Sequence, residues 1–281
     1  IAFRQGLAET GHVDGQNVTI EYRWGDGKVE RLPALAAQLV RRRIAVLAVA
    51  GSPAARLAAK NATATIPIVF VSAGDPIEEG LVTSLSRPGG NITGVSFRNT
   101  VMDPKRLGLL HEVAPSSAPI AILVDPAIFP GETQAAQMQA AARALGRQVN
   151  ILNASSEVEL DSAFSALAQL RSGALLVTTS PFFNRRRQQL IAFAARNAIP
   201  AIYESREFAL AGGLMSYGAS VTDAFRQLGA YVGKILKGAV PAALPVVQTL
   251  RLEFVINVKA AKALGLKIPQ SMLLRTDELI E

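Results

Sequence analysis

The sequence has no cysteine and little else that points to catalysis. The missing cysteine excludes disulfides, thiolate metal sites and cysteine nucleophiles. Only two histidines occur, His12 and His111, and both lie on or beside predicted helices, away from the predicted strand ends. No nucleophile elbow, phosphate-binding loop or dinucleotide-binding glycine pattern is present. We therefore expect no catalytic residue, no metal site and no cofactor.

Charges and long apolar runs are also scarce. Charged residues make up 18% of the chain, and the net charge is +7. No apolar run reaches the length of about 18 residues that a membrane-spanning helix needs. The two arginine clusters, at residues 41–43 and 185–187, lie on or near predicted helices without interleaved aromatic residues on which bases could stack. We expect solvated helix faces there and no nucleic-acid partner.

What the chain does contain is an alternation of amphipathic helices and short apolar strands. Helices are predicted at residues 1–10, 31–43, 52–61, 102–113, 132–145, 157–171, 184–197 and 221–237. Strands are predicted at residues 18–22, 46–49, 68–71, 120–124, 149–152, 174–177 and 201–203. Continuous apolar runs indicate strands that are buried on both faces, so the pattern predicts parallel sheets with helical crossovers.

A turn-rich segment divides this alternation into two halves. Residues 87–94 hold a proline and three glycines and lead into a short strand. The fold class is therefore α/β, with two similar doubly wound parallel-sheet domains. The chain begins at Ile1, inside a predicted helix, so we expect that a first strand and any export signal preceded it.

The strand ends of the first half nominate candidate ligand-binding residues, because ligands of open parallel sheets bind beyond the carboxyl ends of the strands. Ser52, Pro53 and Ala54 begin a helix after one strand, and its free N–H groups could receive a carboxylate or simply be hydrated. Asp75 follows the next strand. Its carboxylate could bind a ligand ammonium or fix its own loop.

The second half offers a similar set after its own strands. Ser180 and Phe183 follow the strand at 174–177, and the phenylalanine could line an apolar pocket or pack on a neighbouring helix. Tyr203 ends the strand at 201–203 and Glu204 follows it, and Tyr217 lies near the end of a later strand. Glu204 could pair with a ligand cation or with an arginine two residues further on.

Several segments resemble the ABC-transporter substrate-binding proteins related to the tryptophan-binding lipoproteins. The matching segments run in order along almost the whole chain, at residues 3–7, 15–18, 66–70, 75–76, 87–95, 200–203, 212–218, 254–257 and 263–269. The resemblance implies a type I periplasmic-binding-protein fold whose two lobes are joined by a three-segment hinge. The implied lobes are residues 1–97 with 218–248, and residues 98–217 with 249–281. The implied hinge segments lie near residues 94–98, 216–219 and 248–251.

By the same resemblance, closure of the lobes buries a small organic ligand. Its contacts would be Ser52, Pro53, Asp75 and Ser96 on one side and Ser180, Phe183, Tyr203 and Tyr217 on the other. The protein would work in the periplasm or another extracytoplasmic space, with an ABC permease and its ATPase as partners. It would meet the membrane only through the permease or a lost lipid anchor.

The strand-end residues favour an amino acid or an aromatic or apolar carboxylate as the ligand. Two other functions stay open. A ligand-sensing module of a receptor or regulator would have the same fold. An enzyme built on two α/β domains would need carboxylates as its catalytic groups, because cysteine is absent.

Overall fold

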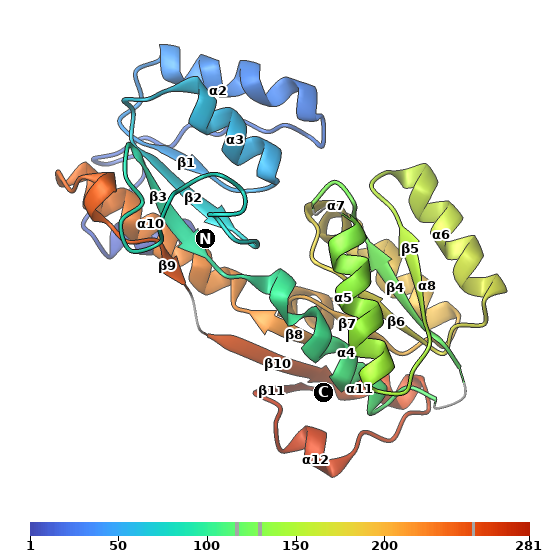
Figure 1. Ribbon diagram of the computed structural model, residues 1–281. Coiled ribbons are helices and arrows are strands. Elements are labelled where there is room, and N and C mark those ends of the chain that lie inside the picture. Colours follow the sequence, from blue (N-terminus) through green and yellow to red (C-terminus); the bar gives the residue numbers. More distant parts are fainter. Residues whose placement is uncertain (116–117, 129–130, 249–250) are drawn as a thin grey trace. The chain divides into compact units, whose positions relative to one another are not determined.

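The structure, a computed structural model, describes residues 1–115, 118–128, 131–248 and 251–281 and divides the chain into two compact units (Figure 1). The first unit holds Ile1–Arg98 and Ser220–Arg251, and the second holds Asn99–Ala219 and Leu252–Glu281. The chain thus passes between the units three times. The predicted boundaries lie within three residues of these positions, but residues 249–250 of the third predicted hinge segment lie outside the described residues.

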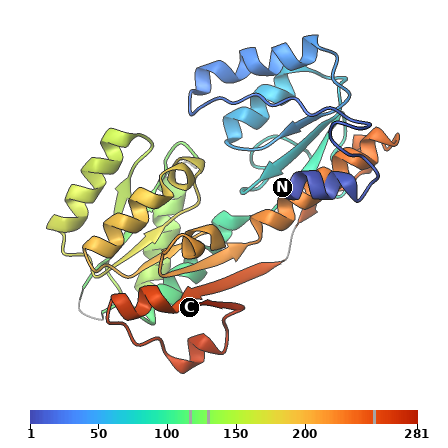
Figure 2. The ribbon, with the colours of Figure 1, turned by 180° about the vertical axis from the view of Figure 1, so that it is seen from behind.

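The first unit is built on a parallel sheet in the order β1-β2-β3-β9. These strands are β1 (Leu47–Val49), β2 (Ile68–Ser72), β3 (Ile92–Ser96) and β9 (Val247–Gln248). Their apolar residues face two separate cores, which explains why the strands read as continuous apolar runs. One face is covered by α2 (Leu32–Arg41) and α3 (Pro53–Ala62), and the other by α1 (Ala2–Ala8) and α10 (Val221–Leu236) (Figures 1 and 2).

Helices α1 and α10 pack with their backbones close together. A Cβ atom at Gly6 would overlap the carbonyl oxygen of Arg226, and one at Gly229 would overlap the carbonyl oxygen of Phe3. Glycine at both positions permits an approach that any side chain would block. The first helix of the chain is therefore held by residues more than 200 positions later.

The second unit has a larger sheet in the order β11-β10-β8-β7-β6-β4-β5. Its strands are β4 (Ile120–Val124), β5 (Val149–Asn153), β6 (Ala174–Val177), β7 (Ala201–Tyr203), β8 (Met215–Ala219), β10 (Leu252–Asn257) and β11 (Glu278–Ile280). Every pairing is parallel except that of β8 with β10. Strand β10 is the segment with which the chain re-enters the second unit after its last passage through the first, and it pairs antiparallel with β8.

Helices cover both faces of this sheet as well. One core lies beneath α4 (Asp103–His111), α5 (Gly131–Ala144), α11 (Val258–Ala263) and α12 (Gln270–Leu273). The opposite core lies beneath α6 (Glu157–Gln169), α7 (Pro181–Arg185), α8 (Arg187–Arg196) and α9 (Arg206–Leu210). The two figures agree that α4 and α5 lie on one side of the sheet and α6 and α8 on the other (Figures 1 and 2).

Two sequence-based expectations are wrong in detail. Residues 18–22 do not form a strand, because only Val18 makes a bridge, to Asp14, and no neighbouring strand pairs with the segment. The helix expected at 184–197 begins earlier, at Pro181, and is interrupted at Arg186, where the backbone leaves the helical region. None of the helices within the described residues is both long and apolar enough to cross a membrane.

Candidate functional site

The carboxyl edge of the first unit's sheet brings together the loops that follow β1, β2 and β3. Ser52 is the N-cap of α3, and its Oγ accepts a hydrogen bond from the Ala55 N–H at 3.3 Å. Pro53 occupies the first helical position, where a missing N–H leaves no helical hydrogen bond unmade. Ser52, Pro53 and Ala54 are all partly exposed, so solutes can reach this helix start.

Asp75 and Ser96 are joined to this edge through Gly74. Ser96 is buried and donates to the Gly74 carbonyl at 3.0 Å, while the Gly74 N–H donates to Ser72 Oγ at 3.0 Å. Asp75 is partly exposed, accepts from the Ile77 N–H at 2.8 Å and lies 3.6 Å from Arg98. Asp75 therefore fixes its own loop through Oδ1.

A buried ion pair, which sequence reasoning missed, anchors the same loops. Arg56 of α3 makes two hydrogen bonds to the Glu79 carboxylate, at 2.7 and 2.9 Å. Its third nitrogen donates to the carbonyls of Gly51, just after β1, and of Val71, near the end of β2. Ser72 also donates to Glu79, at 2.6 Å. A guanidinium suits this position because its planar fork reaches several acceptors at once.

In the second unit, Ser180 lies at the carboxyl end of β6 and is fully engaged. Its Oγ accepts from the N–H groups of Phe182 and Phe183 and donates to Asp125 at 2.5 Å. Asp125 follows β4 and also accepts from Ser155 at 2.7 Å. These contacts tie together the loops after three strands, β4, β5 and β6.

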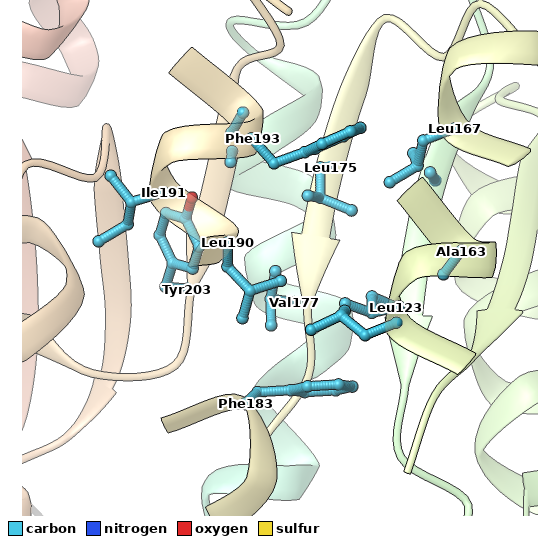
Figure 3. Packing of buried hydrophobic residues seen from close by; sticks show 14 of the residues in the cluster. Leu123, Ala163, Leu167, Leu175, Val177, Phe183, Leu190, Ile191, Phe193 and Tyr203 are labelled. Carbon is cyan, nitrogen blue, oxygen red and sulfur yellow. The ribbon is translucent and has the colours of Figure 1, made fainter. Parts of the chain in front are cut away.

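The structure places two predicted site residues in the hydrophobic core. Phe183 and Tyr203 are buried within the cluster beneath α6 and α8 (Figure 3). Tyr203 stacks on Phe208 with ring centroids 4.5 Å apart, and burial raises the pKa of its hydroxyl. Among the described residues its hydroxyl has no hydrogen-bond partner. These positions indicate a packing role for both rings.

Glu204, directly after β7, is only 2% exposed and does not pair with Arg206, whose partner is Glu278. Its two carboxylate oxygens accept from Asn184 at 2.5 Å and from Asn99 at 2.8 Å. Burial raises the pKa of the Glu204 carboxyl, while the nearby positive charge of Arg106 and the hydrogen bonds act against that rise.

Tyr217 is the predicted second-unit residue whose side chain stays partly exposed. Its ring meets Phe254 edge-on, with centroids 6.1 Å apart, and its carbonyl accepts from Arg106 Nε at 2.6 Å. The two units thus each present polar or aromatic groups at the carboxyl edge of a sheet.

Some of the buried polar residues could have been found from the sequence and others could not. Asp125 directly follows a predicted strand, so the strand-end rule applies to it as it does to Glu204. Arg56 and Arg106 lie within helices, and no local pattern marks them as the arginines that are buried. Within the described parts of the chain, no three His, Asp or Glu side chains are grouped to hold a metal ion.

Comparison with known proteins shows the family to which the sequence belongs. A family model described as "ABC transporter substrate binding protein" matches residues 2–280. A Clostridioides difficile (strain R20291) protein called "Tyrosine-binding protein" is 26% identical over 265 residues, covering 94% of this chain and 76% of the relative.

Solved structures agree in fold. An ABC domain from Streptococcus pneumoniae in complex with L-Trp has a TM-score of 0.88 at 26% identity, over 99% of this chain and 93% of that one. A conserved domain protein from Vibrio cholerae has a TM-score of 0.87 at 26% identity, over 99% and 94%. The fold is that of the type I periplasmic binding proteins. With a family match over nearly its whole length, the chain belongs to the ABC transporter substrate-binding protein family.

Proposed function

We propose that this chain binds an aromatic amino acid in the periplasm or another extracytoplasmic space and delivers it to an ABC permease with its own ATPase. The observation that carries the proposal is the family match over residues 2–280. Two relatives at 26% identity support the ligand class, since one is named for tyrosine binding and the other was solved with L-Trp. The protein binds its ligand without chemical change.

The partly exposed edge residues are the ones that we assign to ligand contact. In the first unit these are the start of α3, at Ser52, Pro53 and Ala54, and the carboxylate of Asp75. The helix start favours a carboxylate, and Asp75 favours an ammonium group. In the second unit Tyr217 offers a partly exposed ring for an aromatic side chain.

The buried edge residues have a supporting role in this proposal. Ser96, Ser180 and Glu204 have their polar atoms occupied by loop contacts, so they hold the edges in shape. We propose that the two edges act on one ligand and that binding favours a closed form over an open one, which the permease then recognises. A ligand shifts such a balance only by its preference for one form.

Calorimetric titration with L-tryptophan, L-tyrosine and L-phenylalanine tests the proposal. Tryptamine lacks the carboxylate and indole-3-propionate lacks the ammonium group, so both should bind far more weakly than L-tryptophan. Mass spectrometry after incubation should recover the ligand unchanged. Equal binding of tryptamine and L-tryptophan would exclude the assigned carboxylate contact, and a product would exclude transport without chemistry.

The variant Asp75→Asn tests the ammonium contact. The amide oxygen can still accept from the Ile77 N–H, so the loop contact is kept while the negative charge is lost. We expect affinity for L-tryptophan to fall at least about tenfold, the value of one charge-assisted hydrogen bond. Asp161→Asn, on the exposed face of α6, is the matched control and should bind like the parent protein. Unchanged affinity in Asp75→Asn would remove Asp75 from the site.

A further inference from the structure

The second-unit ends of all three passages between the units contact one another. The chain enters or leaves this unit at Asn99, Ala219 and Leu252. Asn99 Oδ1 accepts from the Ala219 N–H at 2.7 Å, and Ala219 is the register partner of Leu252 in the β8–β10 pairing. A side chain, and not only sheet hydrogen bonding, therefore links the first passage to the second.

Asn99 is fully buried, and its amide group continues the network. Nδ2 donates to the carbonyl oxygen of Glu204 at 3.2 Å and to its carboxylate at 2.8 Å. Asn184 holds the other carboxylate oxygen. The polar atoms of Asn99 are thus shared between the end of β7 and the end of β8, which fixes the relative position of these two strand ends.

Arg106 adds a second link to the end of β8. Its side chain is fully buried, and it donates from Nε to the Tyr217 carbonyl at 2.6 Å and from Nη1 to Asp103 at 2.5 Å. A Cβ atom at Gly218 would lie too close to three polar atoms, the Glu204 carbonyl oxygen, Asn99 Oδ1 and Arg106 Nη2. Polar groups therefore pack closely against the β8 backbone on the side to which a Cβ atom of Gly218 would point. We call Asn99, Arg106, Asn184 and Glu204 the crossing cluster.

A cluster of this kind is costly if it serves only stability. Buried ionised groups lose hydration, and well-packed apolar residues of similar size are often as stable. What directional hydrogen bonds add is a single geometry for the backbone that they hold. Here that backbone includes the residues from which the chain leaves for the first unit.

We propose that Asn99, Arg106 and Glu204 are positioning residues for ligand binding, which set the balance between the open and closed forms without touching the ligand. The proposal rests on the binding function proposed above. By holding the passages at Asn99 and Ala219 in one geometry, the crossing cluster limits how far the unliganded protein departs from the form that binds. If the crossing cluster is loosened, the unliganded protein populates more conformations, and its affinity for the ligand falls.

Distance measurements between two spin labels test this directly. The chain has no cysteine, so Leu57→Cys and Val158→Cys introduce the only two thiols, at positions that are 48% and 76% exposed in the first and second units. Double electron–electron resonance then gives the distribution of distances between the two labels, with and without L-tryptophan. In Asn99→Ala we expect the unliganded distribution to be broader than in the parent, and the Kd for L-tryptophan to rise roughly tenfold, which is about 1.4 kcal/mol.

Asn91→Ala is the matched control. Asn91 also uses its amide to hold two backbone carbonyls, those of Thr63 and Ile66, but within the first unit and away from the passages. This variant should unfold at a lower temperature and keep the parent's distance distribution. If Asn99→Ala does not fold, Glu204→Gln takes its place, since it keeps the shape of the side chain and removes the charge.

The outcomes separate this proposal from the binding function. A variant of the crossing cluster whose unliganded distribution matches the parent's would overturn the positioning role. The same would follow if Asn91→Ala broadened the distribution equally. Failure of the parent to bind any of the three aromatic amino acids would instead overturn the proposed ligand, while the unliganded distances would still decide the role of the cluster.

Discussion

At the scale of single residues, Glu204 shows how burial and hydrogen bonding compete. Its carboxylate is held by two asparagines and lies near Arg106, which favours the charged form, yet burial outweighs them and raises the pKa of Glu204. The positive charge that acts on it belongs to α4, where Arg106 is paired with Asp103. A group with a raised pKa binds a proton more tightly in the folded than in the unfolded protein.

The sign of the resulting pH dependence follows from this difference. The stability linked to Glu204 is fully present below its ordinary pKa of 4.5 and is lost as pH rises through the higher pKa of the folded protein. Glu204→Gln cannot lose a proton. We expect its free energy of unfolding to gain on the parent's by roughly 1.4 kcal/mol for each pH unit between the two pKa values.

Urea unfolding of both proteins between pH 4 and 8 measures this gain. Asp161→Asn, which removes an exposed carboxylate, should show no such trend. If the unfolding free energy of Glu204→Gln instead falls relative to that of the parent as pH rises, folding lowers the pKa of Glu204. The hydrogen bonds would then outweigh burial.

The sequence indicates which residues follow a strand, but it does not indicate where tertiary packing turns their side chains. The strand-end rule selected Ser52 and Asp75, which the structure leaves partly exposed, but also Phe183 and Tyr203, which turn into the core. The rule locates the backbone of a residue and not its side chain. Arg106 was missed because a helix interior gives no sign of which charged residue will be buried.

At the scale of elements, the pairing of α1 with α10 depends on glycine. Gly229→Ala places a methyl group against the Phe3 carbonyl, so the helices must move apart. We expect a loss of about 1–3 kcal/mol, as for overpacked cores. Gly108→Ala, in the middle of α4 with open space around its Cβ, is the control and should gain up to about 1 kcal/mol from helix propensity. Chemical denaturation measures both, and a neutral Gly229→Ala would contradict the close packing.

The elements predicted from the sequence were those with a strong local signal. Continuous apolar runs identified β2, β4 and β6, and amphipathic spacing identified α2 and α10. Strands β10 and β11 were not predicted as strands. They form because β10 pairs with β8 and β11 then pairs with β10 at the edge of the sheet. The strand predicted at residues 18–22 is absent for a related reason. A β-branched run that has no neighbouring strand to pair with does not become a strand.

At the scale of the whole molecule, two compact units joined by three passages allow a change in shape on binding. From the proposed function we expect a smaller radius of gyration with saturating L-tryptophan than without it, as measured by small-angle scattering. A ligand at about 100 times its Kd should also raise the free energy of unfolding by about 2.7 kcal/mol. D-tryptophan at the same concentration is the control. Binding without any decrease in radius would contradict closure.

The discontinuity of the first unit also constrains how the chain folds. Helix α1 cannot pack against α10 until residues 221–236 have been synthesised. Bringing the two helices together then closes a long loop of chain, which costs conformational entropy. The hydrogen bond between Asn99 and Ala219 joins the two ends of the second-unit segment at residues 99–219, which makes up more than half of that loop. A second unit that folds early would therefore shorten the effective loop and speed assembly of the first. A nascent chain therefore begins with its N-terminal unit but cannot complete it until residues 220–251 have been synthesised.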